Sequence, residues 1–182
     1  PRIAICRSAA SAIEIAASFG MVPGRDVTDL ADLMAVPLHP DLDAIHEAIG
    51  PDTIAKFLCT SGSTGNPKAV INTQRMICAN QVMLRETLAF LKDEPPVIVD
   101  WLPWNHTFGG NHNIGLTLYN GGSMYLDEGK PVPGGIEETV RNLREISPTV
   151  YFNVPKGYES LLPYLRDDRA LREKFFGRLH AM

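Results

Sequence analysis

From residue 54 onward, short apolar runs alternate with longer segments whose apolar residues recur at helical spacing. Four runs have the length of buried strands: residues 54–59, 97–102, 123–126 and 149–153. Four segments have the helical pattern: residues 76–91, 114–119, 136–146 and 155–165. Strands that alternate with helices favour β-α-β units, in which helices cover both faces of a mostly parallel sheet. The sequence therefore predicts the α/β fold class, and Pro163 is expected to kink or split the last helix.

The first 53 residues have a less regular pattern. Residues 3–6 resemble a strand, residues 8–19 form an Ala-rich helical pattern that ends at Gly20, and short helices are predicted at 28–34 and 42–49. We assign residues 1–53 to an N-terminal part of the same domain and residues 54–182 to a truncated α/β subdomain. Because the chain starts without methionine and stops in an apolar run, we expect a piece of a longer protein.

Charge and cysteine content exclude several classes of protein. The formal net charge is −4 and no basic run occurs, which argues against a nucleic-acid partner. No stretch reaches the roughly 18 uninterrupted apolar residues that a membrane span needs. The three cysteines are far apart and form no C-x-x-C pair, which disfavours a disulfide framework or zinc site and predicts a reducing, cytoplasmic location.

A hydroxyl- and glycine-rich stretch, TSGSTGNPK at residues 60–68, follows the first predicted strand of the subdomain and precedes a predicted helix. Glycines let backbone N–H groups converge on an anion, hydroxyls add donors and a lysine adds positive charge. The stretch thus predicts a phosphate-binding loop. Neither the Walker spacing nor the Gly-x-Ser-x-Gly elbow occurs, and composition leaves a flexible surface loop as the alternative.

This stretch resembles, at every position, the T-S-G-S-T-G-x-P-K signature of the adenylate-forming superfamily, which includes acyl-CoA synthetases and adenylation domains. The downstream order is also similar: WNHTFGG at residues 104–110, NGG at 120–122, SPT at 147–149 and NVP at 153–155. The WNHTFGG variant is most similar to feruloyl-CoA-synthase-like members. The resemblance covers residues 52–182 and implies a fragment of the large N-terminal domain, a partial subdomain of the family fold.

The resemblance also implies roles for particular residues. Lys68 supports the phosphate loop as a catalytic and ATP-binding residue, His106 lies beside the acyl carboxylate as a catalytic and substrate-binding residue, and Phe108 contacts the acyl group. The remaining residues that the resemblance places around the β- and γ-phosphates of ATP are Thr60, Ser61, Gly62, Ser63, Thr64 and Gly65. Mg²⁺ is expected to bridge phosphate oxygens, and no protein side chain is assigned as a metal ligand.

Other polar residues invite different interpretations. Without the family motif, His106 is a loop histidine hydrogen-bonded to backbone. A metal site shared with His112 is disfavoured, because the six-residue spacing lies on a loop and no third ligand accompanies it. Asp127 and Glu128 are expected in an exposed, solvated turn.

The implied activity is that of an AMP-forming acid–thiol ligase, which adenylates a carboxylic acid and passes the acyl group to coenzyme A. A hydroxycinnamate such as ferulate is the favoured acid, with fatty and short-chain acids left open. A carrier-protein-loading adenylation domain and a catalytically silent ligand-binding module are the alternatives. The family's ribose-binding aspartate, metal-holding glutamate and C-terminal lysine have no counterpart, so the chain alone is expected to be inactive and to self-associate.

Overall fold

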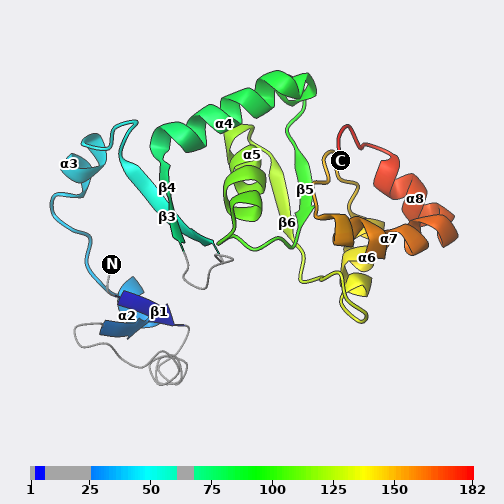
Figure 1. Cartoon of the computed structure of the whole chain (residues 1–182), viewed down its shortest axis with the longest axis horizontal. Coiled ribbons are helices and arrows are strands. Elements are labelled where there is room, and N and C mark those ends of the chain that lie inside the picture. The colour runs from blue at the N-terminus through cyan, green and yellow to red at the C-terminus, as the bar shows by residue number, and fades with distance from the viewer. Residues whose placement is uncertain (1–2, 7–25, 61–67) are drawn as a thin grey trace. The chain divides into compact units, whose positions relative to one another are not determined.

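The computed structural model describes residues 3–6, 26–60 and 68–182, which belong to two compact units, Pro1–Ile49 and Gly50–Met182 (Figure 1). In the first unit, β1 (Ile3–Cys6) pairs in parallel with β2 (Asp26–Asp29). Two short helices follow, α2 (Leu30–Met34) and α3 (Leu42–Glu47). The predicted strand and both short helices are therefore confirmed, whereas the helix predicted at residues 8–19 lies outside the described residues.

The second unit begins with an antiparallel hairpin. Strand β3 (Ile54–Thr60) pairs with β4 (Lys68–Thr73), with Thr60 opposite Lys68 and Lys56 opposite Asn72. The prediction that a helix follows residues 60–68 is wrong, because a strand comes first. Its sequence, KAVINT, carries three β-branched residues, which favour an extended backbone.

A second pair of strands, β5 (Val97–Asp100) and β6 (Ser123–Leu126), runs in parallel and carries helices on both faces. Successive strand residues point to opposite faces. Ile98 packs with Leu91, Leu116 and Val150, whereas its neighbour Val99 packs among the three C-terminal helices. The described residues thus form three two-stranded sheets, one of them antiparallel, and a mostly parallel sheet is not what they show.

Helix α4 (Gln74–Thr87) begins where the hairpin ends. The Thr73 hydroxyl accepts a hydrogen bond of 3.3 Å from the Met76 N–H, which caps the helix. A 3₁₀ turn, η1 (Ala89–Lys92), continues the chain towards β5. Between β5 and β6 lie the π-helix η2 (Phe108–Asn113) and α5 (Ile114–Tyr119).

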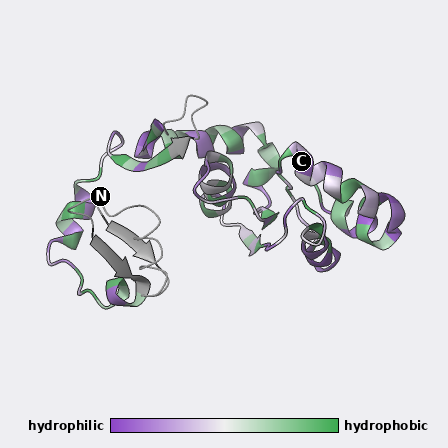
Figure 2. Ribbon diagram, turned by 60° about the horizontal axis from the view of Figure 1, so that its bottom comes forward, coloured by the Kyte–Doolittle hydropathy of each residue, from purple (hydrophilic) through white to green (hydrophobic). Residues whose placement is uncertain are grey.

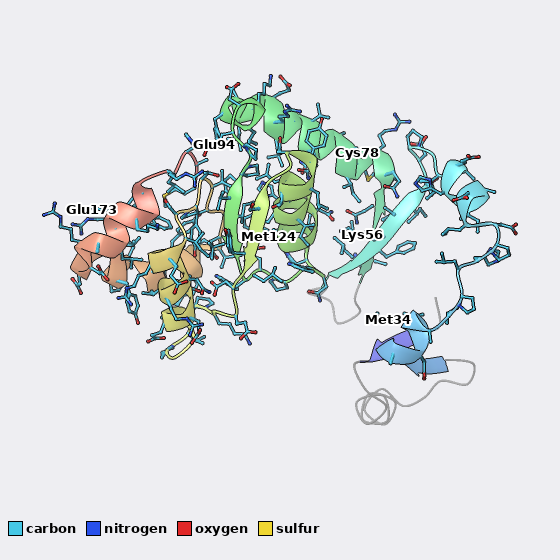
Figure 3. The ribbon with its side chains drawn as sticks, turned by 180° about the vertical axis from the view of Figure 1, so that it is seen from behind. Met34, Lys56, Cys78, Glu94, Met124 and Glu173 are labelled. Carbon is cyan, nitrogen blue, oxygen red and sulfur yellow. The ribbon has the colours of Figure 1, made fainter. Side chains whose placement is uncertain are left out.

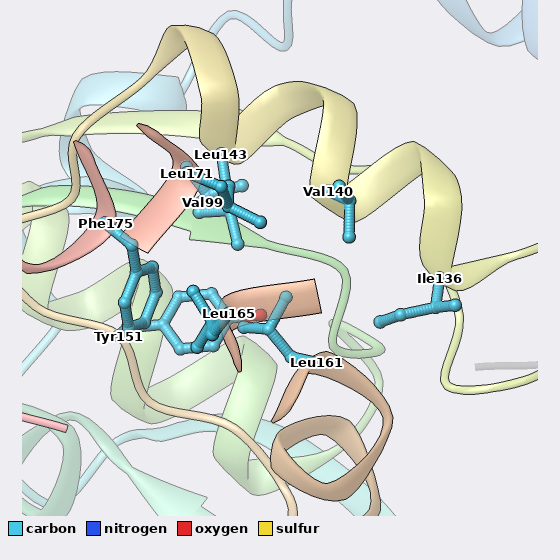
Figure 4. Packing of buried hydrophobic residues seen from close by; sticks show 9 residues of the cluster. All are labelled: Val99, Ile136, Val140, Leu143, Tyr151, Leu161, Leu165, Leu171 and Phe175. Atoms are coloured by element: carbon cyan, nitrogen blue, oxygen red, sulfur yellow. The ribbon is translucent and has the colours of Figure 1, made fainter. Parts of the chain in front are cut away.

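Three helices complete the unit: α6 (Ile136–Glu145), α7 (Pro155–Asp167) and α8 (Arg169–Phe176). Hydrophilic and hydrophobic residues alternate along the helices (Figure 2). In α6 the buried apolar positions 136, 140 and 143 recur at helical spacing and form one apolar stripe. Figure 4 shows this stripe facing Val99 and the aromatic rings of Tyr151 and Phe175, whose centroids are 5.2 Å apart.

Two further predictions fail in this part of the chain. Residues 149–153 form only an isolated bridge, Val150 to Ala181, because the segment meets β5 only at its first residue, Val97. Helix α7 continues through Pro163 to Asp167, so the proline does not split it, and a kink at Pro163 stays a prediction. Helix α8 was not predicted. Among the described residues, every helix is too short or too polar to span a bilayer.

Candidate functional site

The hairpin holds the two ends of the predicted phosphate loop together. Thr60 is the last residue of β3 and Lys68 the first of β4, and the two are register partners. The other predicted phosphate-binding residues lie outside the described residues: Ser61, Gly62, Ser63, Thr64 and Gly65.

The strand after the loop changes which donors can bind phosphate. A strand rises about 3.3 Å per residue, so the six residues of β4 put the start of α4 roughly 20 Å from the loop. The partial positive charge of a helix N-terminus falls off within about one turn. The α4 dipole therefore adds little at the predicted phosphate loop, so the predicted donors are reduced to those that the loop sequence and Lys68 carry.

The segment after β5 carries the predicted acyl-site histidine. The His106 side chain is exposed, and its Nδ1 accepts a hydrogen bond of 3.2 Å from the Phe108 N–H. A ring nitrogen that accepts a hydrogen bond carries no proton, so the neutral imidazole keeps its proton on Nε2. This geometry leaves Nε2–H available as a donor and fixes the ring by a contact two residues away.

The buried carboxylate of Asp100 holds the segment after β5 in place by two hydrogen bonds. The Oδ1 of Asp100, at the end of β5, accepts hydrogen bonds of 3.1 Å from the Leu102 N–H and from the Asn113 side-chain amide. Among the described residues, the buried Oδ2 has no hydrogen-bond partner. Burial raises the pKa of Asp100, although the two donors oppose this effect. Asp100 thus ties the start of the loop to the end of the π-helix.

The amide of Asn113 extends this contact to a second histidine. Its Oδ1 lies 2.9 Å from Nδ1 of His112, whose ring packs edge-on against Phe108 and Phe152. Because the Asn113 Nδ2 donates to Asp100, the Oδ1 must accept, so His112 carries a proton on Nδ1. The hydrogen bond to Asn113 therefore holds the His112 ring in its contact with Phe108 and Phe152.

No group of three His, Cys, Asp or Glu side chains suited to a metal occurs in the described parts of the chain.

Two glycines let the π-helix approach the strand-end backbone. A Cβ built on Gly109 would lie 2.5 Å from the Pro103 carbonyl oxygen, and one on Gly110 would lie 2.0 Å from the Trp104 carbonyl oxygen. Both distances are below van der Waals contact, and the obstructing atoms are backbone. Only glycine fits at these positions, so the pair of glycines sets how closely the π-helix packs against residues 102–104.

A largely apolar pocket of about 550 Å³ joins the hairpin to this segment. The hairpin contributes Leu58 and Val70, and the segment after β5 contributes both His106 and Phe108. A volume of this size lies within the ordinary range for small-molecule sites. The remaining lining residues are Trp101, Leu102, Pro103, Asn105, Thr107 and Val154. The structure therefore places the predicted acyl-site residues in one pocket with the strands that flank the phosphate loop.

Sequence reasoning misplaced or missed several polar residues near this site. Asp127 is buried, not solvated, because its carboxylate accepts hydrogen bonds from Gly129 N–H, Thr139 and Asn142. Its partners come from α6, twelve and fifteen residues along the chain, so no local signal marks them. Asp100 was assigned no role from the sequence either, although a charged residue at the end of an apolar strand is a signal that it has buried partners.

Comparison with known proteins agrees with this geometry. The family described as AMP-binding enzyme matches residues 8–182. The long-chain-fatty-acid–CoA ligase ACSBG2 of Xenopus laevis is 30% identical over 144 residues, which are 76% of this chain and 17% of that protein. The medium-chain-fatty-acid–[acyl-carrier-protein] ligase TtuA of Teredinibacter turnerae is 40% identical over 82 residues, or 45% of this chain and 12% of that protein. The chain therefore spans a small part of these relatives.

Solved structures show the same fold. The ATP-bound RpMatB–BxBclM chimera B1 superposes with a TM-score of 0.70 at 25% identity, over 98% of this chain and 34% of that one. ATP-bound MatB from Rhodopseudomonas palustris has a TM-score of 0.70 at 24% identity, with the same coverage, and supports the fold alone. With a family match that covers all but the first seven residues, this chain belongs to the AMP-binding enzyme family, the adenylate-forming superfamily.

Proposed function

We propose that this chain is part of the large N-terminal domain of an ATP-dependent ligase that adenylates a carboxylic acid and transfers the acyl group to a thiol. The observation that carries the proposal is the shared pocket, in which hairpin residues Leu58 and Val70 meet His106 and Phe108. Such a pocket sets an acid next to the loop that would hold the phosphates of ATP. Coenzyme A is the first candidate for the thiol.

The loop must solve a problem of charge. A carboxylate that attacks the α-phosphorus of ATP approaches a polyanion, so donors and a cation must neutralise the phosphates and keep them in line. The hydroxyls and N–H groups of residues 60–65, with Lys68, have the chemistry for this role. Mg²⁺ would neutralise further charge between phosphate oxygens, and the described residues offer no carboxylate cage for it.

His106 would orient the acid. Because Phe108 N–H occupies Nδ1, the imidazole can present Nε2–H to a carboxylate or acyl-adenylate oxygen as a hydrogen-bond donor. The exposed ring lines the pocket, so an acid bound there lies within its reach. We assign His106 the role of holding the acid for attack, and Phe108 that of contacting the acyl chain.

A fatty acid is the proposed substrate class. The lining is mostly apolar, and the two curated relatives named above are a long-chain and a medium-chain fatty-acid ligase. One of those relatives uses coenzyme A and the other an acyl-carrier protein, so the acceptor needs its own test. Ferulate and related hydroxycinnamates, favoured by the WNHTFGG loop, remain the alternative acids.

The test is thioester formation by the complete protein that contains this chain. We would supply ATP, Mg²⁺ and acids from C8 to C18 together with ferulate, and offer coenzyme A or a phosphopantetheinyl carrier protein in separate reactions. Mass spectrometry of the products should show a fatty acyl-CoA. A ferulate product would change the substrate class, acyl transfer only to the carrier would change the acceptor, and no product with any acid would favour a silent ligand-binding module.

The 182 residues alone are proposed to be inactive. They contain no match to the family's ribose-binding aspartate, metal-holding glutamate or C-terminal lysine. Exposed apolar side chains on the hairpin, among them Phe57 and Ile71, would favour self-association of the isolated chain. Sedimentation and a product assay on the purified 182-residue chain test both points.

A further inference from the structure

We propose that Lys56 and Asn72 are positioning residues that hold the phosphate-loop hairpin against the π-helix η2, so that the ATP side and the acid side of the site are aligned together. This inference rests on the proposed function. Lys56 lies on β3 (Figure 3) and Asn72 on β4, and the two are cross-strand partners. Directly paired residues lie on the same face of a hairpin, so both side chains reach one neighbour.

That neighbour is the middle of the π-helix. The Lys56 Nζ donates a hydrogen bond of 3.2 Å to the Gly110 carbonyl oxygen. The Asn111 side-chain amide donates one of 2.8 Å to the Asn72 Oδ1. One cross-strand pair therefore contacts two consecutive residues of the helix, which restrains its position more tightly than a single contact does. We call these two hydrogen bonds the hairpin clamp.

Asn72 and Asn111, on the two sides of the hairpin clamp, each form a further hydrogen bond. Asn72 is buried, with 8% of its surface exposed, and its Nδ2 donates to the Val70 carbonyl oxygen at 3.0 Å. The Asn111 carbonyl oxygen accepts a hydrogen bond of 2.9 Å from Nε2 of Gln81, a residue of α4 that is 3% exposed. Buried polar groups of this kind fix one arrangement, because a lost partner leaves a desolvated donor or acceptor.

The clamp connects the two halves of the proposed site by short paths. Lys56 lies four residues before Thr60 and Asn72 four residues after Lys68, so the clamped pair is on the same two strands that hold the loop ends. On the other side, the Gly110 N–H donates to the His106 carbonyl oxygen at 2.8 Å. A shift of the hairpin relative to η2 would change the distance between the phosphate loop and His106, and misplacement by about 1 Å can reduce a rate roughly 100-fold.

Substitutions that each remove one hydrogen bond of the clamp test it in the complete ligase, although Asn72→Leu also removes the Asn72 donor to the Val70 carbonyl oxygen. Lys56→Met removes the donor but keeps the length of the side chain, and Asn72→Leu removes the acceptor at similar volume. Asn72→Asp is the conservative variant, because it keeps the Oδ1 that accepts from Asn111. Lys156→Met is the matched control, since this exposed lysine forms a surface ion pair with Glu159 at 3.2 Å. The assay is acid-dependent pyrophosphate exchange, with kcat and the KM values for ATP and acid measured separately.

We expect Lys56→Met and Asn72→Leu to lower kcat roughly 10- to 100-fold, with Asn72→Asp and Lys156→Met closer to wild type. The decisive readout is non-additivity with His106→Asn. If the clamp acts by placing His106, Lys56→Met should cost little more in the His106→Asn background. Amide exchange at residues 108–113 should also become faster in Lys56→Met and Asn72→Leu, and should stay closer to the wild-type rate in Asn72→Asp, which keeps the acceptor for Asn111.

The outcomes separate this inference from the proposed function. Suppose that the wild-type enzyme exchanges pyrophosphate. The clamp alone is then overturned if the clamp variants have the wild-type kcat, or if their losses of kcat multiply with the loss caused by His106→Asn. Unchanged amide exchange at residues 108–113 in Lys56→Met also overturns it, and this variant supplies the measurement if Asn72→Leu is too unstable for kinetics. A wild-type enzyme inactive with every acid overturns the proposed function and the clamp with it.

Discussion

The side-chain amide of Asn113 donates a hydrogen bond of 3.1 Å to the Oδ1 of Asp100, and both side chains are buried. Burial raises the pKa of the Asp100 carboxyl above its ordinary value of 3.8. A carboxyl with a raised pKa binds its proton more tightly in the folded state than in the unfolded state. Its contribution to stability is therefore full at low pH and is lost as the pH rises from about 4 through the folded pKa.

Asp100→Asn should not lose stability in this way as the pH rises, because the amide is neutral at every pH. As the pH rises from 4 to 7, we expect the free energy of unfolding of Asp100→Asn, measured by urea unfolding, to increase relative to that of wild type. Asp168→Asn is the control with the opposite sign. The Leu171 N–H and the guanidinium of Arg144 lower the pKa of Asp168, so the free energy of unfolding of wild type should increase relative to that of Asp168→Asn as the pH rises to about 4 from below, and the difference should then stay level. A constant difference between wild type and Asp100→Asn would contradict the assignment.

Lys68→Ala should lower the rate of adenylation by the complete ligase. Lys68 is the first residue of β4 and pairs with Thr60, so the two residues lie at the ends of the predicted phosphate loop. Loss of one group that stabilises developing charge typically costs about 3 kcal/mol, or 10²- to 10³-fold in rate. Thr64→Ala should act in the same direction. The matched control is Lys174→Ala on α8, and equal rates for Lys68→Ala and this control would remove Lys68 from the phosphate site.

Two substitutions of His106 distinguish the roles of its two ring nitrogens, Nδ1 and Nε2. Glutamine places an amide N–H near the position of Nε2 and so keeps the donor to the acid, whereas asparagine keeps an acceptor near Nδ1 for the Phe108 N–H. If the donor matters, His106→Gln should retain more thioester formation than His106→Asn, by about tenfold for a charge-assisted hydrogen bond worth roughly 1.5 kcal/mol. ATP affinity should change little in either variant. The reverse order would assign His106 a structural role.

Gly109→Ala should destabilise the chain. The added methyl group would lie 2.5 Å from the Pro103 carbonyl oxygen and 2.9 Å from that of Leu102, so the π-helix must move away from the strand end. Overpacking of this kind costs about 1–3 kcal/mol. Gly50→Ala is the control, because a Cβ there meets no atom within 4 Å. Thermal unfolding of both variants measures the difference, and equal melting temperatures would show that the close approach is not required.

Local sequence patterns predicted the elements whose burial depends on their own periodicity. The stripe at 136, 140 and 143 marked α6, and the apolar runs marked β5 and β6 within two residues of their observed ends. The hairpin was missed, because β4 follows the polar loop directly and runs into α4 with no turn residue between strand and helix. The π-helix has no local signal, since it depends on how Gly109 packs against a backbone carbonyl.

Within the site, the sequence identified the residues that carry motifs but not those that position them. His106 and Phe108 were chosen from a family pattern, and they do line the pocket. Lys56, Asn72 and Asp100 find their partners on elements 13 to 54 residues away, and no pattern of sequence separation encodes such contacts. Thr73 caps α4, whereas its neighbour Asn72 bonds to the π-helix, and sequence alone does not distinguish these roles.

The most direct test of the central claim is carboxylate-dependent exchange of pyrophosphate into ATP by the complete wild-type ligase. With Mg²⁺ and a medium- or long-chain fatty acid, but no thiol, the account predicts exchange that requires the acid and stops when the acid is omitted. This result would show that the ligase adenylates the acid before any thiol takes part. No exchange with any fatty acid or hydroxycinnamate, or exchange independent of acid, would contradict the account.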